Sequence, residues 1–227
     1  MAWKDEPKNL IVDFLNKNIT DPRGRLSAVT DTFNGTGASQ ILPLTPTAGK
    51  KVRSINSVTS NAVTKSKWQD YTFDIQNNTV TGTFDSGTGN VVVTYNEGTT
   101  GWIFPDLAKV TLTSTSYPRI NVLLVSSKAE RMGNYTADLQ STEHYQADIW
   151  VKENYYYNDG TIVHEGDALA MYLARQMIKA FEDNINELYP YLQHFTHLNT
   201  RDAVWETERQ CFHVIVEFEL SGISIGG

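Results

Sequence analysis

The chain has 227 residues, a formal net charge of −7 and an aromatic content of 11%. The acidic balance argues against a general nucleic-acid binder, which needs a basic face to neutralise phosphates, and the aromatic content argues against a disordered chain. The length suits one domain with a large insertion, or two small domains. A single cysteine, Cys211, excludes an intrachain disulfide. We see neither a signal-peptide pattern nor an apolar run of about 18 residues, so we expect no leader and no membrane span.

The first predicted element is a helix that begins at Pro7 and ends near Asn18. Proline suits the first helical turn, where its missing N–H costs no hydrogen bond. Apolar residues recur at helical spacing, as at Leu10 and Phe14, and give the helix one face that can pack on a core.

Residues 27–66 are rich in Ser, Thr, Asn and Gly, and neither the helical nor the strand period persists in them. We interpret them as an extended arm or linker with too few apolar residues to offset its own chain entropy. Residues 68–113 regain a period of two, with turn residues between short apolar runs, which predicts a small antiparallel β unit.

The carboxyl-terminal half predicts a sheet and a long helix. Pro118 cannot donate to a strand ladder, so it suits the entrance of the apolar strand 120–125. A second strand follows at 145–151, and a helix at 167–188 carries an apolar stripe along one side. The last strand, 211–220, alternates most clearly, which is typical of an antiparallel sheet with one face covered.

The polar face of that last strand predicts a surface, a lumen or a subunit contact. Glu217 and Glu219 lie two residues apart on it, and two carboxylates need water or a cationic partner. On the neighbouring strand, Trp150 falls on the same polar face.

We find no convincing catalytic, metal or cofactor site. His194 and His197 are spaced for zinc but lack further ligands. Asp138 and Asp148 would suit a metal nuclease beside Lys152, yet the position two before that lysine is not acidic, so the pattern fails. Cys211 has no evident activating base and is interpreted as a packed strand thiol.

Aromatic residues suggest a second class of function. Tyr71, Phe73, Trp102 and Phe104 could form a platform that recognises a glycan or a host surface, provided that their rings are exposed. The run Tyr155–Tyr157 could stack sugars or bases, but tyrosine clusters more often pack a sheet edge or an interface.

The order of elements carries a resemblance. An amino-terminal helix, a proline-led strand in YPRINVLLV, a strand in YQADIWV, a long helix and a closing strand in CFHVIVEFEL resemble the tail terminator and tail completion proteins of long-tailed phages and viruses. The resemblance covers residues 3–26 and 116–222, and residues 27–115 have no counterpart in it.

The resemblance implies an α+β fold: an antiparallel or mixed sheet flanked by the amino-terminal helix and one long helix. Residues 1–26 and 116–227 would form the core, and 27–115 an inserted arm and β unit.

It further implies a non-enzymatic virion protein without cofactors. Such proteins form a ring, usually of six copies, on the head-proximal end of the tail tube, where they stop tube polymerisation and contact the neck. DNA would pass through the channel without specific binding, and the chain would reach the virion after assembly in the host cytoplasm. Subunit contacts or the channel lining would involve Arg119, Trp150, Glu217 and Glu219. Alternatives are another neck, connector or tail subunit, the glycan- or host-binding module, and the nuclease.

Overall fold

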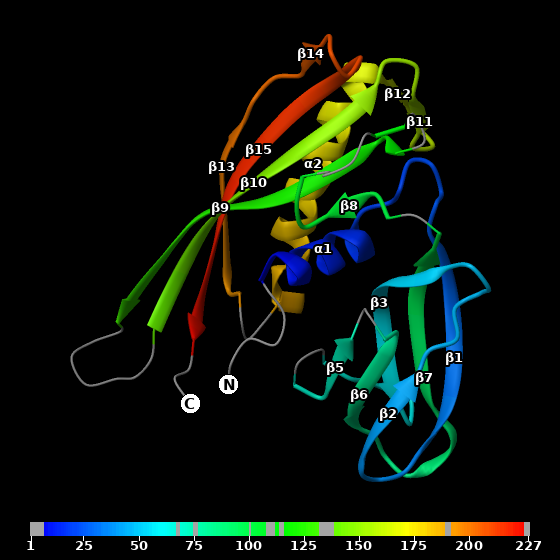
Figure 1. The fold of residues 1–227 in the computed structure, drawn as a ribbon. Helices are drawn as coiled ribbons and strands as arrows, with labels where there is room; N and C mark the ends of the chain where they lie inside the picture. The colour runs from blue at the N-terminus through cyan, green and yellow to red at the C-terminus, as the bar shows by residue number, and fades with distance from the viewer. Residues whose placement is uncertain are drawn as a thin grey trace. The chain divides into compact units, whose positions relative to one another are not determined.

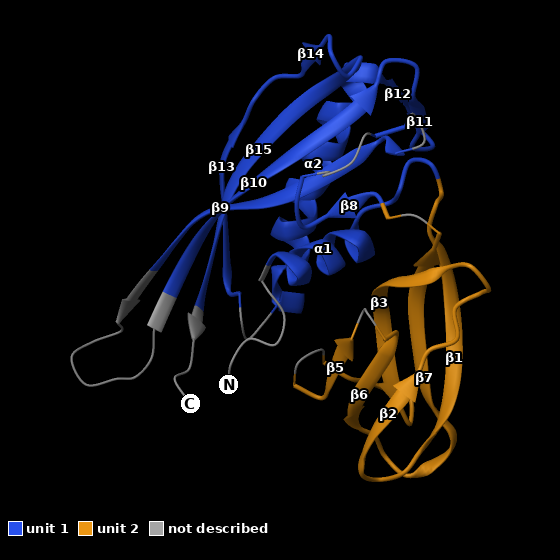
Figure 2. Ribbon diagram, in the orientation of Figure 1, with its two compact units in different colours: residues 1–23, 102–227 blue, residues 24–101 orange. Residues whose placement is uncertain are grey.

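A computed structural model describes residues 7–66, 69–74, 77–99, 101–107, 112–113, 116–131, 139–188 and 192–224. The chain forms two compact units (Figure 2). Unit 1 consists of Met1–Arg23 and Trp102–Gly227, and unit 2 of Gly24–Gly101. The second boundary lies earlier than the predicted 115/116, because Ile103 and Phe104 pair with the first core strand and so belong to unit 1.

Unit 1 is built on one sheet. Its strands are β8 (Ile103–Phe104), β9 (Arg119–Arg131), β10 (Leu139–Lys152), β13 (His194–Thr200), β14 (Val204–Glu206) and β15 (Cys211–Ser224). Their order is β13-β15-β10-β9-β8, and β14 also pairs with β15 (Figure 1). All neighbours are antiparallel except β8 and β9. The three predicted strands of the carboxyl-terminal half therefore lie side by side.

Two helices pack on this sheet. They are α1 (Pro7–Asn18) and α2 (Gly166–Asn184), and α2 continues as a single 3-10 turn at Ile185–Leu188. Helix α2 contacts β15 and β10, whereas α1 contacts β8, β9 and α2. The predicted α+β fold, with the amino-terminal helix and one long helix beside a sheet, is confirmed. The predicted helix 167–188 thus corresponds to α2 and the 3-10 turn together.

Stacked aromatic rings form the core between the helices and the sheet. Phe181 of α2 stacks on Phe14 of α1 at 4.9 Å and on Phe195 of β13 at 4.8 Å between ring centroids. It also lies 5.2 Å from the ring of Phe218 on β15. These contacts join four elements far apart in sequence, and Phe181 is fully buried. The apolar faces predicted from periodicity are the faces that meet.

A small hairpin precedes α2. Strands β11 (Tyr156–Asn158) and β12 (Val163–Glu165) pair with each other alone in the described chain, and both contact α2. His164 of the hairpin stacks on Tyr172 of α2 at 4.1 Å.

Unit 2 consists of two antiparallel sheets. One contains β1 (Ser27–Gly35), β7 (Gly87–Gly98), β3 (Lys51–Ser60) and β4 (Val63–Thr64); the other contains β2 (Ser39–Pro43), β6 (Thr79–Thr83) and β5 (Tyr71–Asp74). Buried residues from both sheets form one cluster: Leu42, Leu44, Val52, Ile55, Val58, Tyr71, Phe73, Val80, Phe84, Val91, Val93 and Tyr95. Unit 2 is therefore a small β-sandwich with its own core.

The prediction of an extended arm at 27–66 is wrong. That segment contributes strands β1 to β4, and β1 pairs along its length with β7, about 60 residues further on (Figure 1). Thr and Ser occupy many exposed strand positions, so the alternation is weak in the sequence. The entropy argument failed because apolar residues spread through this segment, such as Leu42 and Val58, share one buried core with apolar residues of 71–95.

In the described part of the chain, the helices are too short or too polar to cross a membrane.

Candidate functional site

The sheet of unit 1 has a second face, which we call the helix-free face because it lies opposite α1 and α2. It carries Cys211, His213, Ile215, Glu217 and Glu219 of β15, the residues paired with them on β10, and Arg119 and Asn121 of β9. All four predicted interface residues lie on this face. They differ in exposure: Glu217 and Glu219 are partly exposed, whereas Arg119 and Trp150 are buried.

Glu217 has a cationic partner within the same chain. Its Oε1 accepts a hydrogen bond from Arg201 Nη2 at 3.0 Å. The Arg201 side chain is 57% exposed, so this is a surface ion pair that contributes less than about 1 kcal/mol. The sequence predicted that this carboxylate needs water or a cation, and Arg201 of the same chain is such a cation. Glu219 lies two residues further along β15, opposite His144 of β10 and Thr196 of β13.

Arg119 is 8% exposed, so it does not offer a surface charge in the single chain. Its guanidinium carbon lies 3.6 Å from the ring centroid of Phe104, and its Nε donates to Asn121 Oδ1 at 2.7 Å. Burial lowers the pKa of Arg119. The residue that follows Pro118 thus fixes the start of β9 against the parallel strand β8.

Trp150 lies on the predicted face but is only 5% exposed. Its ring stacks on His213 of β15, with centroids 3.7 Å apart and planes 7° from parallel. The guanidinium carbon of Arg209 lies 4.4 Å from the same indole. The turn before β15 covers this face at Trp150, so Trp150 lies on the predicted face but is not exposed in the single chain.

The imidazole of His213 joins two carboxylates. Its Nε2 lies 2.9 Å from Asp148 Oδ1, and its Nδ1 lies 3.6 Å from Glu206 Oε1. Asp148 is 4% exposed and also accepts a hydrogen bond from Gln146 Nε2 at 2.9 Å. The arrangement links β10, β14 and β15 through polar contacts, because a buried carboxylate needs donors to offset its lost hydration.

This geometry does not bring ligands together around a metal. The two carboxylates contact opposite ring nitrogens of His213, so they point toward the ring and not toward a common point. Within the described ranges, no group of three or more His, Cys, Asp or Glu side chains could hold a metal ion. The nuclease hypothesis included Asp138, which lies outside those ranges; its other carboxylate, Asp148, is engaged by His213 and Gln146.

Cys211 lies at the start of β15 on the same face and is fully buried. Burial raises the pKa of its thiol, and the positive charges of Lys152 and Arg209 offset this only in part. The thiol therefore stays protonated at neutral pH, and the protonated form is a poor nucleophile.

The aromatic residues proposed as a glycan platform are not exposed. Tyr71 and Phe73 are 6% and 7% exposed and belong to the core of the sandwich, and Trp102 is fully buried in unit 1. Phe104 is partly buried and packs under Arg119. The exposure that this hypothesis requires is absent at these positions. In the run Tyr155–Tyr157, the middle residue alone is open, at 72%.

No protein-family model matches the chain, and a search of curated proteins finds no match. Any assignment of function therefore depends on the residues and the fold alone.

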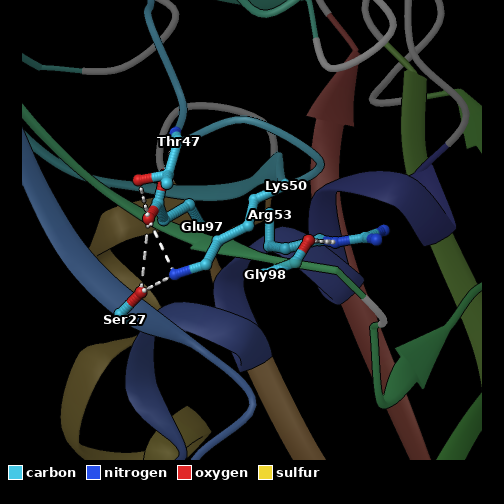
Figure 3. Close-up of polar contacts among 6 residues, drawn as sticks. All are labelled: Ser27, Thr47, Lys50, Arg53, Glu97 and Gly98. Carbon is cyan, nitrogen blue, oxygen red and sulfur yellow. Dashed lines mark hydrogen bonds and ion pairs between the residues drawn. The ribbon is translucent and has the colours of Figure 1, made fainter.

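Unit 2 contains a polar cluster that the sequence did not reveal. Figure 3 shows Lys50, Thr47 and Ser27 around the carboxylate of Glu97 near the end of β7. Lys50 Nζ and Thr47 Oγ1 donate to Oε1 at 2.9 and 2.7 Å, and the Thr47 backbone N–H donates to Oε2 at 2.6 Å. Ser27 Oγ lies at 3.5 Å from Oε1.

Glu97 is 1% exposed, and its environment favours the ionised form. Burial by itself raises the pKa of Glu97, but the hydrogen bonds from Lys50 and Thr47 outweigh burial and lower the pKa to about 2. The carboxylate thereby holds the loop 44–50 against the ends of β1, β3 and β7.

A second carboxylate holds the same loop. Asp31 Oδ2 accepts hydrogen bonds from the Thr45 backbone N–H at 2.7 Å and from Thr45 Oγ1 at 3.0 Å. It also accepts from the Tyr95 hydroxyl at 3.2 Å. Burial, and then the nearby Asp31 charge, raise the pKa of Tyr95 to about 12. We interpret both carboxylates as stabilising groups of the sandwich, since every contact described for them is to its own loop and strands.

Proposed function

We propose that the chain is a structural virion protein that assembles into a ring at the head-proximal end of a tail tube. In this role it terminates polymerisation of the tube and joins the tail to the neck. The observation that supports the proposal most is the single sheet of unit 1, whose apolar face is covered by α1 and α2 and whose opposite face carries no helix in the described part of the chain. This is the arrangement that the family resemblance implies for residues 3–26 and 116–222.

The partners follow from the position of such a ring. The ring consists of copies of this chain, usually six, and contacts the tube protein on one side and a neck protein on the other. Contacts around a ring are heterologous, so each copy offers two different surfaces. The chain reaches the virion after assembly in the host cytoplasm.

Glu217 and Glu219 are the proposed channel residues. They are partly exposed on the helix-free face, and a lining of negative charge lets DNA slide because like charge disfavours phosphate contacts. The ion pair with Arg201 reduces the net charge at Glu217, so Glu219 carries more of this role. Arg119 and Trp150 support the face from within the chain and do not line the channel.

Electron microscopy of the purified full chain tests the proposal. We expect negatively stained rings with a central opening, either alone or after co-expression with the tail-tube protein of the same genome. In the second case, the rings would cap one end of each tube. Particles of single-chain size in both preparations, together with uncapped tubes, would overturn the proposal.

Another neck, connector or tail subunit is the alternative that the same fold could serve. Immunogold labelling of whole virions separates the two, because a terminator is labelled at the junction of tail and neck, whereas a tube subunit is labelled along the tail.

A further inference from the structure

The sheet of unit 1 has two open edges. On one side, β8 pairs only with Ile120 and Asn121, and no described strand pairs with that side of β9 from Val122 onward. On the other side, β13 pairs with β15, and no described strand covers its outer side. Both edges can be followed in Figure 1, with β13 and β9 on opposite sides of β15 and β10.

Neither edge is protected by charged residues or proline along its open run, although each edge strand contains one bulge. Natural edge strands are commonly blocked by charges, proline or strong irregularity. The sequence of β13, HFTHLNT, contains no Lys, Arg, Asp, Glu or Pro. The open part of β9 begins with VLLVSS, which is equally uncharged up to Lys128. The bulge of β13, between His197 and Asn199, leaves Leu198 exposed. The bulge of β9, between Leu124 and Ser126, leaves Val125 exposed.

Both edges also present apolar side chains to solvent. On β9, Leu124 is 43% and Val125 is 54% exposed. At the opposite edge, Leu198, Val204 and Trp205 are 44%, 61% and 40% exposed. Covering these side chains would remove apolar surface from water at both edges.

Strand direction decides how the two edges fit. Passing from β9 through β10 and β15 to β13, every step is antiparallel, so β9 and β13 run in opposite directions. A sheet that continues from one copy to the next would therefore set β9 beside β13 in antiparallel pairing, with the helices of both copies on the same side. The chain thus contains both halves of one strand pair.

We propose that β9 of one copy pairs antiparallel with β13 of the next copy, so that the sheet continues from subunit to subunit. This inference rests on the proposed ring, because such head-to-tail contacts close only in a ring or extend into a filament. It names the two different surfaces that the ring requires, and the partner at each is a second copy of this chain.

The register identifies a pair of residues for cross-linking. Ser126 pairs with His144, His144 with Glu219, and Glu219 with Thr196. Ser126 and Thr196 therefore lie in one row on the helix-free face at opposite edges, and both are exposed. Cysteines at these positions in neighbouring copies would come within disulfide distance when the strands pair without stagger. A stagger of two residues would bring Ser126 opposite His194 instead.

Disulfide trapping of the full chain is the first experiment. The double variants Ser126→Cys with Thr196→Cys, and Ser126→Cys with His194→Cys, are oxidised and run without reductant. We expect a ladder of covalent dimers, trimers and larger species from one of them. Single-cysteine variants can give dimers at most, and the buried native Cys211 gives little background. Absence of a ladder from both double variants would overturn the proposed pairing.

Edge blocking is the second experiment. Val125→Lys blocks the β9 edge and Leu198→Lys blocks the β13 edge; Ile162→Lys, on the 59% exposed tip of the β11–β12 hairpin, is the matched control. We expect each blocked variant to lose assembly beyond a monomer, and an equimolar mixture of the two to form heterodimers. The control should assemble like the unaltered chain. Unchanged thermal melting shows that the variants fold.

These outcomes separate the pairing from the proposed function. Rings that persist in both blocked variants would reject the edge pairing and leave the ring protein intact as a proposal. A disulfide ladder from a chain that never caps tubes would support the pairing and reject the terminator role.

Discussion

The two units cover their sheets in different ways. Unit 1 packs two helices on one face of a single sheet, and no described helix lies on the opposite face. Unit 2 packs two sheets against each other, and its polar carboxylates serve to hold a loop. A sandwich uses the inner faces of both its sheets for its own core, whereas the helix-covered sheet keeps one face and two edges available. We therefore expect unit 1 to carry the contacts for assembly. We also expect a substitution in the core of one unit to destabilise that unit and not the other.

Removal of Phe181 gives the largest expected effect. Phe181→Ala leaves a cavity where the rings of Phe14, Phe195 and Phe218 meet, which costs about 3–5 kcal/mol of unfolding free energy. Hydrogen exchange followed by mass spectrometry should show lost protection in unit 1 alone.

Phe84→Ala is the matched variant, because Phe84 is equally buried but belongs to the core of unit 2. Its protection loss should appear in unit 2 alone. If either variant weakened both units equally, the comparison between two independent cores would be wrong.

Glu97→Gln tests the carboxylate of the sandwich. The amide keeps the shape but loses the charge that accepts hydrogen bonds from Lys50 and Thr47, and we expect a loss of about 2 kcal/mol, since bonds to charged groups contribute about 1.5–3 kcal/mol each. Peptides covering 44–50 should exchange faster. Glu187→Gln, which alters a surface ion pair with Lys17, is the control and should change little.

The same carboxylate predicts a pH dependence of unit 2. The pKa of Glu97 is about 2 in the folded chain and near its ordinary 4.5 when unfolded. Its stabilisation is therefore complete above about pH 4.5 and is lost as the pH falls toward 2. Urea unfolding between pH 6 and 2.5 should show this loss. A Glu97→Gln chain that loses stability as steeply as the unaltered chain would contradict the assignment.

Arg201→Ala gives the smallest expected effect on stability. The ion pair with Glu217 is solvent-exposed, so urea unfolding should change by less than about 1 kcal/mol, and added salt should reduce the difference further. The variant also leaves Glu217 without this cation. A loss above 2 kcal/mol would mean that the helix-free face is far less open to water than its exposure indicates.

Much of unit 1 could be predicted from the sequence, because its elements have strong local patterns. Helix α2 carries an apolar stripe over many turns, and β15 alternates from Phe212 to Leu220, so each reveals its covered face without knowledge of a partner. Unit 2 lacked this advantage. Its strand β1 is polar and gains its place only by pairing with β7, and such pairing over a long sequence separation leaves no local signal.

The site was predictable only in part for the same reason. The face on which Trp150 lies follows from strand alternation. Its burial depends on Arg209, which lies in the turn between β14 and β15. Glu97 gave no signal, since its donors Thr47 and Lys50 precede it by about 50 residues. Two glutamates on one strand face are visible in a sequence, whereas a carboxylate that closes a distant loop is not.

The pairing of Ser27 with Glu97 has one more consequence. Paired residues of antiparallel strands lie about 5 Å apart at their Cα atoms. The polypeptide therefore enters and leaves unit 2 at nearly the same point. A tight turn could bridge that gap as well as the whole sandwich does. An insertion tethered in this way could be gained, exchanged or deleted as a cassette during evolution while the rest of the polypeptide keeps its fold.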